Sequence, residues 1–245
     1  MTIVVARALE GMGEIAPGDD LAALLAAAAG DDLRAGDVLV VAHKVVSKAE
    51  GALRELATVE PGERARALAE QLDKDPRHVQ VVLDESAAIV RAERGVLICR
   101  TRHGFVCANA GVDASNTPAG TLVTLPRDPD ASARALRAAL PGRPAVVIAD
   151  SFGRAWRHGQ CEVAIGVAGL APLADWRGRT DAAGRELRAT WIATADQAAA
   201  AADLARSKDA GQPAVLVRGL EAHVTADDGP GATALVRAVD EDLFR

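Results

Sequence analysis

The stretch AVVIADSFGR, Ala145–Arg154, joins a short apolar run to a polar segment. The run is rich in β-branched residues, which is typical of a buried β-strand. The polar segment begins at Asp150, where a carboxylate and then a hydroxyl follow the run directly. We therefore expect a strand over Ala145–Ala149 that ends at the crevice where sheet proteins place their ligands.

Strand-like and helix-like patterns alternate on both sides of this stretch. Further strands are expected at Ile3–Ala6, Val38–Ala42, Leu122–Leu125, Val163–Val167, Arg188–Ala193 and Val215–Arg218, with a hairpin of Val96–Arg102 and Phe105–Ala108. Helices are expected at Leu21–Ala29 behind a cap at Asp19 or Asp20, and at Pro61–Leu72, Val79–Ile89, Pro129–Leu140, Asp196–Arg206 and Ala232–Leu243. This alternation predicts an α/β (α+β) fold with a mixed β-sheet and flanking helices. Without an internal repeat or long linker, residues 1–245 are expected to form a single domain, built as one unit or as two closely packed subdomains.

The composition narrows the range of partners. A formal net charge of −6 disfavours nucleic acid, because duplex binding needs basic surfaces. Aromatic residues make up only 2% of the chain, so few side chains can stack on bases. No apolar run approaches the roughly 18 residues of a membrane span, and the N-terminus lacks a signal-peptide pattern. Cys99, Cys107 and Cys161 lack metal-ligand spacing, so we expect them to be reduced, as in a cytoplasmic protein. From the charge, the aromatic content and the apolar runs together, we expect no nucleic-acid partner and no membrane partner.

Two polar segments are candidates for chemistry. Asp150 and the Ser151 hydroxyl offer hard oxygen ligands, which suit Mg²⁺ or Mn²⁺. The segment NAGVDASN, Asn109–Asn116, places Asp113 among small residues that let a ligand approach the backbone. Two carboxylates that converge on divalent cations can hold the phosphates of a nucleotide. The alternatives are a strand-ending aspartate that caps the next turn and an Asx-rich turn with self-satisfied side chains.

Basic residues supply candidate contacts to anions. The segment HKVVSKAEG, His43–Gly51, places Lys44 and Lys48 after a strand, where a lysine is a point charge suited to phosphate. For either lysine alone, a solvated surface position is the alternative. The candidates for holding an anionic substrate are Arg154, Arg157, Arg177 and Arg179. Such arginines can equally form salt bridges within their own loop.

Several common catalytic motifs are absent from the chain. Nothing matches the P-loop, so a nucleotide site would have to be of another type. No G-x-S-x-G, H-E-x-x-H, C-x-x-C or G-x-G-x-x-G occurs either. Their absence argues against serine hydrolases, zinc peptidases and dinucleotide-dependent dehydrogenases.

A set of segments in fixed order carries a resemblance to a known family. The segments are GDDLA (Gly18–Ala22), GDVLVVAHKVVSKAEG (Gly36–Gly51), NAGVDASN (Asn109–Asn116), ADSFGRAWRHG (Ala149–Gly159), AIGVAGL (Ala164–Leu170), DWRGRTDAAGREL (Asp175–Leu187) and PAVLVRG (Pro213–Gly219). From about Leu9 to Gly219 the chain resembles the F420-0:γ-glutamyl ligase family, including its fold. Some relatives carry a fused flavin-binding nitroreductase-like domain at the C-terminus, which we do not expect in this chain.

The resemblance implies an activity. It implies an acid–amino-acid ligase that uses GTP to add L-glutamate to coenzyme F420-0, with the number of γ-linked glutamates left open. The lactyl carboxylate would be activated as an acyl phosphate and attacked by the glutamate amine, releasing GDP and phosphate. The implied cofactors are Mg²⁺ or Mn²⁺, two per site, and K⁺, and the implied assembly is a homodimer. Two alternatives stay open: a related metal-dependent ligase acting on another carboxylate or with another nucleotide, and a non-catalytic F420-binding protein.

The resemblance also implies roles for individual residues. Asp113 and Asp150 would bind one metal, and Ser151 would help to bind a second. The nucleotide would contact Met12, Gly13, Glu14, Ile15, His43, Lys44, Lys48, Asn116, Lys208, Asp209 and Gly211. Where this chain has Arg206–Pro213, the family has a loop that closes on GTP and adds a metal ligand. The expected glutamate is absent at Ser207, so Asp209 is the candidate replacement, and no catalytic side chain is assigned.

Overall fold

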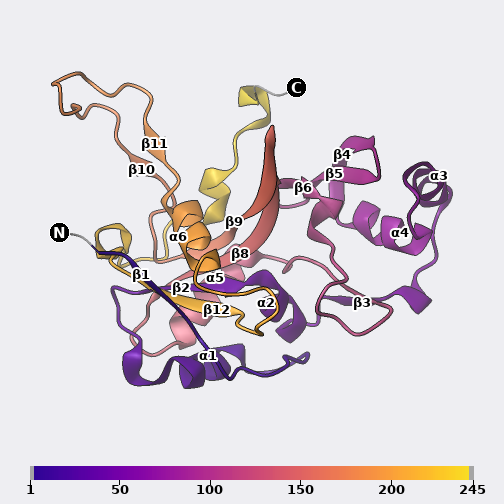
Figure 1. Ribbon diagram of the computed structural model, residues 1–245, viewed down its shortest axis with the longest axis horizontal. Coiled ribbons are helices and arrows are strands. Elements are labelled where there is room, and N and C mark those ends of the chain that lie inside the picture. The colour runs from indigo at the N-terminus through magenta and orange to yellow at the C-terminus, as the bar shows by residue number, and fades with distance from the viewer. Residues whose placement is uncertain (1–2, 243–245) are drawn as a thin grey trace.

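A mixed five-stranded sheet forms the centre of the molecule (Figure 1), in a computed structural model that describes residues 3–242. Its strands lie in the order β1 (Val5–Ala8), β12 (Ala214–Arg218), β2 (Val38–Ala42), β8 (Ala145–Arg154) and β9 (Arg157–Ala168). β2 and β8 are parallel, while the other neighbours are antiparallel. The expected mixed sheet with flanking helices is therefore confirmed.

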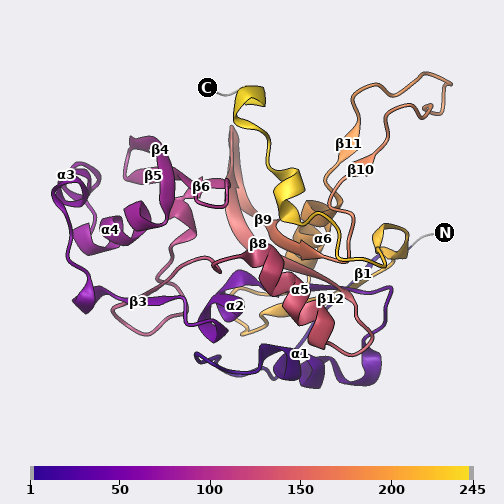
Figure 2. The ribbon, with the colours of Figure 1, turned by 180° about the vertical axis from the view of Figure 1, so that it is seen from behind.

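Helices cover both faces of this sheet. Because side chains alternate along a strand, Leu39 and Val41 point into one core and Val38 and Val40 into the other. The first core is closed by α1 (Leu21–Ala29) and α5 (Pro129–Ala139), which carry N-terminal aspartate caps, and the second by α6 (Thr194–Asp203). α6 is in front of the sheet in Figure 1, and α5 is in front in Figure 2.

A lobe of residues 53–124 lies beside the sheet and has its own hydrophobic cluster. It contains β3 (Leu53–Glu55), α3 (Glu63–Leu72), α4 (Pro76–Asp84), β4 (Ser86–Glu93), β5 (Val96–Thr101), β6 (Val106–Ala108) and β7 (Thr121–Val123). β4, β5 and β6 form an antiparallel sheet, and β3 pairs with β7. The expected hairpin at His103–Gly104 is confirmed as the β5–β6 connection.

The expected helix over Val79–Ile89 is wrong in its second half. α4 ends at Asp84, and Ile89 lies in β4 opposite Cys99 of β5. The residues after Ser86 satisfy a helical spacing, yet Ile89 and Val90 are β-branched and the segment finds a strand partner in β5. Glu93 pairs with Val96 across a tight connection at Arg94 and Gly95, so a hairpin with the next segment replaces the second half of the expected helix.

The expected helix over Ala232–Leu243 is also wrong. The chain forms two short 3-10 turns, Ala232–Leu235 and Val239–Glu241, with extended backbone at Val236 between them. Leu243 lies outside the described residues. The Ala232 amide donates to the buried Asp130 carboxylate at 2.7 Å, so a tertiary contact fixes the start of this segment instead of a helix.

Several expected strands have different extents: the one expected at Ile3–Ala6 is shifted to Val5–Ala8, and the one expected at Val163–Val167 is part of the longer β9. Only Trp191–Ile192 (β11) of the expected strand Arg188–Ala193 is extended, and it pairs with β10 (Ala174–Asp175) at the base of an arm that reaches away from the body (Figure 1). The strand expected to stop at Ala149 instead continues as β8 to Arg154, paired with β9 throughout. Asp150 therefore lies inside a long hairpin, beyond a register shift between Ile148 and Ala149, and not at a strand end.

Among residues 3–242, no helix has the length and apolar character needed to cross a membrane.

Candidate active site

A cleft of about 620 Å³ is lined by residues of the central sheet and of the lobe. Its walls are the turn at residues 13–15, the start of α2 (His43–Ala49), the segment at residues 113–116, the β8–β9 hairpin and the loop at residues 206–213. The cleft brings together these predicted nucleotide and metal contacts: Gly13, Glu14, Ile15, His43, Lys44, Lys48, Asn116, Lys208, Asp209, Gly211, Asp113, Asp150 and Ser151. Met12 does not line it, because its side chain is buried in the hydrophobic core.

Helix α2, which the sequence interpretation did not predict, positions two lysine side chains on one wall of the cleft. It begins at His43, directly after β2, and its spacing presents Lys44 and Lys48 to the cleft one turn apart. Lys48 is only 5% exposed and contacts the Glu14 carboxylate of the N-terminal turn. A solvated surface position for Lys48 is therefore wrong.

Asp113 faces these lysines from the lobe. Its backbone pairs with Val123, and its carboxylate accepts hydrogen bonds from Lys44 Nζ at 2.6 Å and from the Ser115 amide at 2.8 Å. Burial alone raises the pKa of Asp113, but hydrogen bonds and charge from Lys44, together with Ser115, outweigh it and lower the pKa to about 2. The segment Asn109–Asn116 thus contains an Asx-type turn at Asp113 and also contributes to a wall of the cleft. The turn and the candidate binding site, given as alternatives from the sequence, are compatible with each other.

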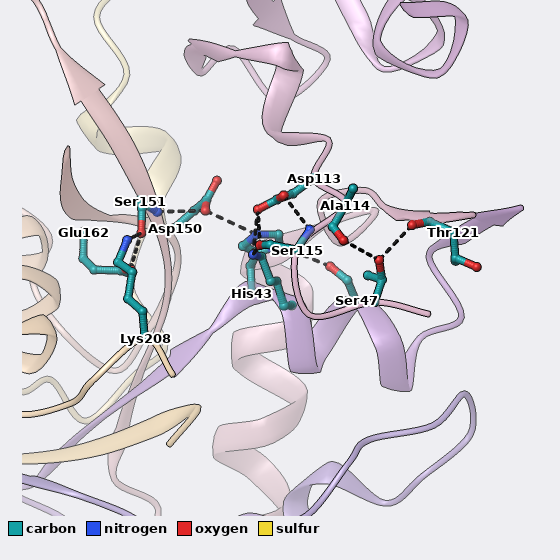
Figure 3. Close-up of polar contacts among 12 residues, drawn as sticks. His43, Ser47, Asp113, Ala114, Ser115, Thr121, Asp150, Ser151, Glu162 and Lys208 are labelled. Atoms are coloured by element: carbon teal, nitrogen blue, oxygen red, sulfur yellow. Dashed lines mark hydrogen bonds and ion pairs between the residues drawn. The ribbon is translucent and has the colours of Figure 1, made fainter. Parts of the chain in front are cut away.

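The β8–β9 hairpin supplies the third wall, with two polar side chains at its centre. The Asp150 carboxylate accepts from the Ser151 amide at 2.8 Å and lies 3.2 Å from Nε2 of the buried His43. Ser151 Oγ donates to Glu162 Oε1 at 2.7 Å and accepts from Lys208 Nζ at 2.8 Å (Figure 3). The expected projection of Asp150 and Ser151 into one crevice is thus seen, although from within a strand.

Glu162 and Arg206 are cleft residues that the sequence interpretation did not single out. Their side chains are buried and face each other, with Arg206 Nη2 at 3.1 Å from Glu162 Oε2. A glutamate just before the apolar run of β9 is a weak signal in the sequence. Its meaning depends on the hairpin register, which sets Glu162 opposite Ser151.

The four arginines predicted to hold an anionic substrate are not among the residues that line the cleft. Arg154 and Arg157 are exposed at the tip of the β8–β9 hairpin. Arg177 pairs with Asp175 at 2.6 Å and stacks on Trp191, while Arg179 stacks on Trp176. Salt bridging within the loop is thus confirmed for Arg177, and substrate binding by the four stays a prediction.

Asp113, Asp150 and Ser151 are the cleft residues whose oxygen atoms could hold a divalent cation. Asp113, Asp150 and Ser151 present hard ligands, and ammonium groups already contact two of them: Lys44 on Asp113 and Lys208 on Ser151. Among the described residues, no three His, Cys, Asp or Glu side chains gather to hold a metal by themselves. Such a donor set suits Mg²⁺, which is commonly held by one or two carboxylates plus substrate phosphates.

The fold is thus a mixed α/β protein in which lysine ammonium groups and carboxylate and hydroxyl oxygens face each other across one cleft. The family model described as F420-0:Gamma-glutamyl ligase matches residues 11–219. The coenzyme F420:L-glutamate ligase of Methanopyrus kandleri is 48% identical over 238 residues, covering 95% of this chain and 94% of that protein. The protein of the same name from Methanothermobacter thermautotrophicus is 44% identical over 245 residues, covering 97% of each chain. The chain belongs to the F420-0:γ-glutamyl ligase family, as the ordered sequence segments indicate.

Proposed function

We propose that this protein joins L-glutamate to coenzyme F420-0 through an amide bond, as a cytoplasmic ligase of coenzyme F420 biosynthesis. One observation carries the proposal: the family match over residues 11–219 includes every wall of a cleft that combines Asp113 and Asp150 with Lys44 and Lys48. The family description supplies F420-0 as a substrate, and the names of the matched relatives supply L-glutamate. The same resemblance supports a homodimer, which light scattering on the purified protein tests.

GTP is the proposed source of energy. A carboxylate oxygen of F420-0 attacks the terminal phosphorus of GTP, and the bond from that phosphorus to the GDP oxygen breaks, giving an acyl phosphate. The glutamate nitrogen then attacks the acyl carbon and loses a proton, while the carbon–oxygen bond to phosphate breaks. Each step moves negative charge, so positioning and preorganised cations contribute most of the catalysis.

We propose a separate binding role for each group of residues in the cleft. Lys44 and Lys48 now pair with Asp113 and Glu14, and we propose that both exchange these partners for phosphate oxygens when GTP enters. Asp113, Asp150 and Ser151 would hold two divalent ions, Mg²⁺ or Mn²⁺, with K⁺ as a further cation. When bound, these ions neutralise phosphate charge. The turn at residues 13–15 and the loop residues Lys208, Asp209 and Gly211 would enclose the nucleotide.

Mass spectrometry tests the proposal directly. F420-0 is incubated with the protein, GTP, Mn²⁺, K⁺ and L-glutamate, and each component is omitted in turn. The expected product is F420-0 with one or more added glutamyl residues, and GDP accumulates over repeated turnovers only when both F420-0 and glutamate are present. A product with ATP and not with GTP would overturn the choice of nucleotide. Binding of F420-0 without any product would mark a non-catalytic binding protein.

A further inference from the structure

The Ser151–Glu162 pair lies at the centre of the β8–β9 hairpin. The register sets the two residues directly opposite each other, so their side chains share one face of the hairpin. Glu162 is only 4% exposed yet lines the cleft. Figure 3 shows its side chain and that of Lys208 converging on Ser151.

The hydrogen bonds of Ser151 determine the direction of its hydroxyl proton. A lysine ammonium can only donate, so the 2.8 Å contact from Lys208 Nζ uses a lone pair of Ser151 Oγ. The single hydroxyl proton must point elsewhere, and Glu162 Oε1 accepts it at 2.7 Å. Ser151 therefore presents its oxygen lone pair to a cation in the cleft because Glu162 accepts the proton.

Arg206 holds Glu162 in this position. Its Nη2 lies 3.1 Å from Glu162 Oε2, and its Nη1 donates to the Pro213 carbonyl at 3.1 Å. Since Arg206 and Pro213 stand at the two ends of the 206–213 loop, the same guanidinium closes the base of the loop that carries Lys208. The Glu162 carboxylate thus connects the Ser151 hydroxyl to that loop.

We propose that Glu162 is a positioning residue that orients the Ser151 hydroxyl toward a cation bound in the cleft. That cation is the Lys208 ammonium in this structure and a divalent metal when the nucleotide is bound, so the inference rests on the proposed function. A neutral hydroxyl is a weak ligand whose affinity depends on where its lone pair points. Loss of residues that orient metal ligands typically weakens metal binding by roughly 10–100-fold.

Mn²⁺ titration in the presence of a non-hydrolysable GTP analogue tests the proposal. E162Q keeps the shape of the side chain, but its amide can donate to Ser151 and turn the hydroxyl proton into the cleft. We expect E162Q and S151A each to weaken Mn²⁺ binding by roughly tenfold or more. The exposed E70Q, on α3, is the matched control and should bind Mn²⁺ as the unmodified protein does.

The double variant S151A/E162Q distinguishes positioning from other roles of Glu162. When one residue acts through another, the double variant loses less Mn²⁺ affinity than the sum of the losses in the two single variants. Its Mn²⁺ affinity should equal that of S151A. A further loss in the double variant would overturn the proposal, since Glu162 would then bind the metal itself or act independently of Ser151. Unchanged Mn²⁺ binding in E162Q would overturn it too.

Thermal unfolding of each variant keeps the test interpretable. If E162Q does not fold, E162D replaces it, because the shorter carboxylate keeps its charge toward Arg206 but withdraws from Ser151. E162D should weaken Mn²⁺ binding as well, and normal affinity would overturn the proposal. Failure of the unmodified protein to bind Mn²⁺ with the analogue would instead refute the proposed function.

Discussion

Replacing Arg206 by methionine tests how much the buried ion pair at the base of the 206–213 loop contributes to stability. The Arg206 and Glu162 side chains are 7% and 5% exposed, so little water can replace a lost partner. Removing one member of a buried pair leaves an uncompensated charge and costs about 3–5 kcal/mol. Arg206→Met also removes one of the two donors to the Pro213 carbonyl, which keeps its hydrogen bond from the Ala42 amide at 2.8 Å, so this change adds little to the loss.

The assay is urea denaturation in EDTA and without nucleotide, so that no metal supplies a substitute charge near Glu162. Linear extrapolation gives the free energy of unfolding of each variant. Arg188→Met is the matched control, because that side chain is 85% exposed and its contact with Glu186 is 3.9 Å long. We expect the control to change stability by less than ~0.5 kcal/mol. A loss of unfolding free energy for Arg206→Met no larger than that of the control would refute the reasoning. The double variant R206M/E162Q should recover part of the loss, because it also removes the unpaired carboxylate charge.

Three further predictions concern the cleft and the sheet. Lys48→Ala should weaken GTP binding in a calorimetric titration by roughly 10–100-fold, the equivalent of one charged hydrogen bond, whereas Lys74→Ala, which lies outside the cleft, should leave it unchanged. Asp113 has a pKa lowered from 3.8 to about 2, so its stabilising contribution is complete above pH 3.8 and is lost as the pH falls toward about 2. Asp113→Asn should lack that part of the acid unfolding curve, and identical curves in this window would contradict the assignment. Asp130→Ala should cost about 2–6 kcal/mol, since it leaves the buried amides of Val167 and Ala232 without their acceptor. Hydrogen exchange at Val167 should accelerate, and protection equal to that of the unmodified protein would contradict this role.

Local patterns were sufficient for the elements that form the main sheet and its helices. The β-branched runs Val38–Ala42 and Ala145–Ala149 lie in strands, and α1 and α5 are capped by Asp20 and Asp128, whose side chains accept from the first-turn amides. These features depend on neighbours within a few residues. The ordered segments were also sufficient to identify the family, because proteins that share a binding site need the same residue types at the positions that line it.

The tertiary structure decided where those residues meet. Asp113 reaches Lys44 across 69 positions of sequence, and Lys208 reaches Ser151 across 57, distances over which periodicity carries no information. The register shift after Ile148 placed Glu162 opposite Ser151, which no local pattern predicted. Contact with Asp130 likewise replaced the expected helix after Ala232 by short turns. Sequence determined which residue types were available and which elements they form, since those depend on short-range sterics, whereas the cleft depends on register and on packing between distant segments.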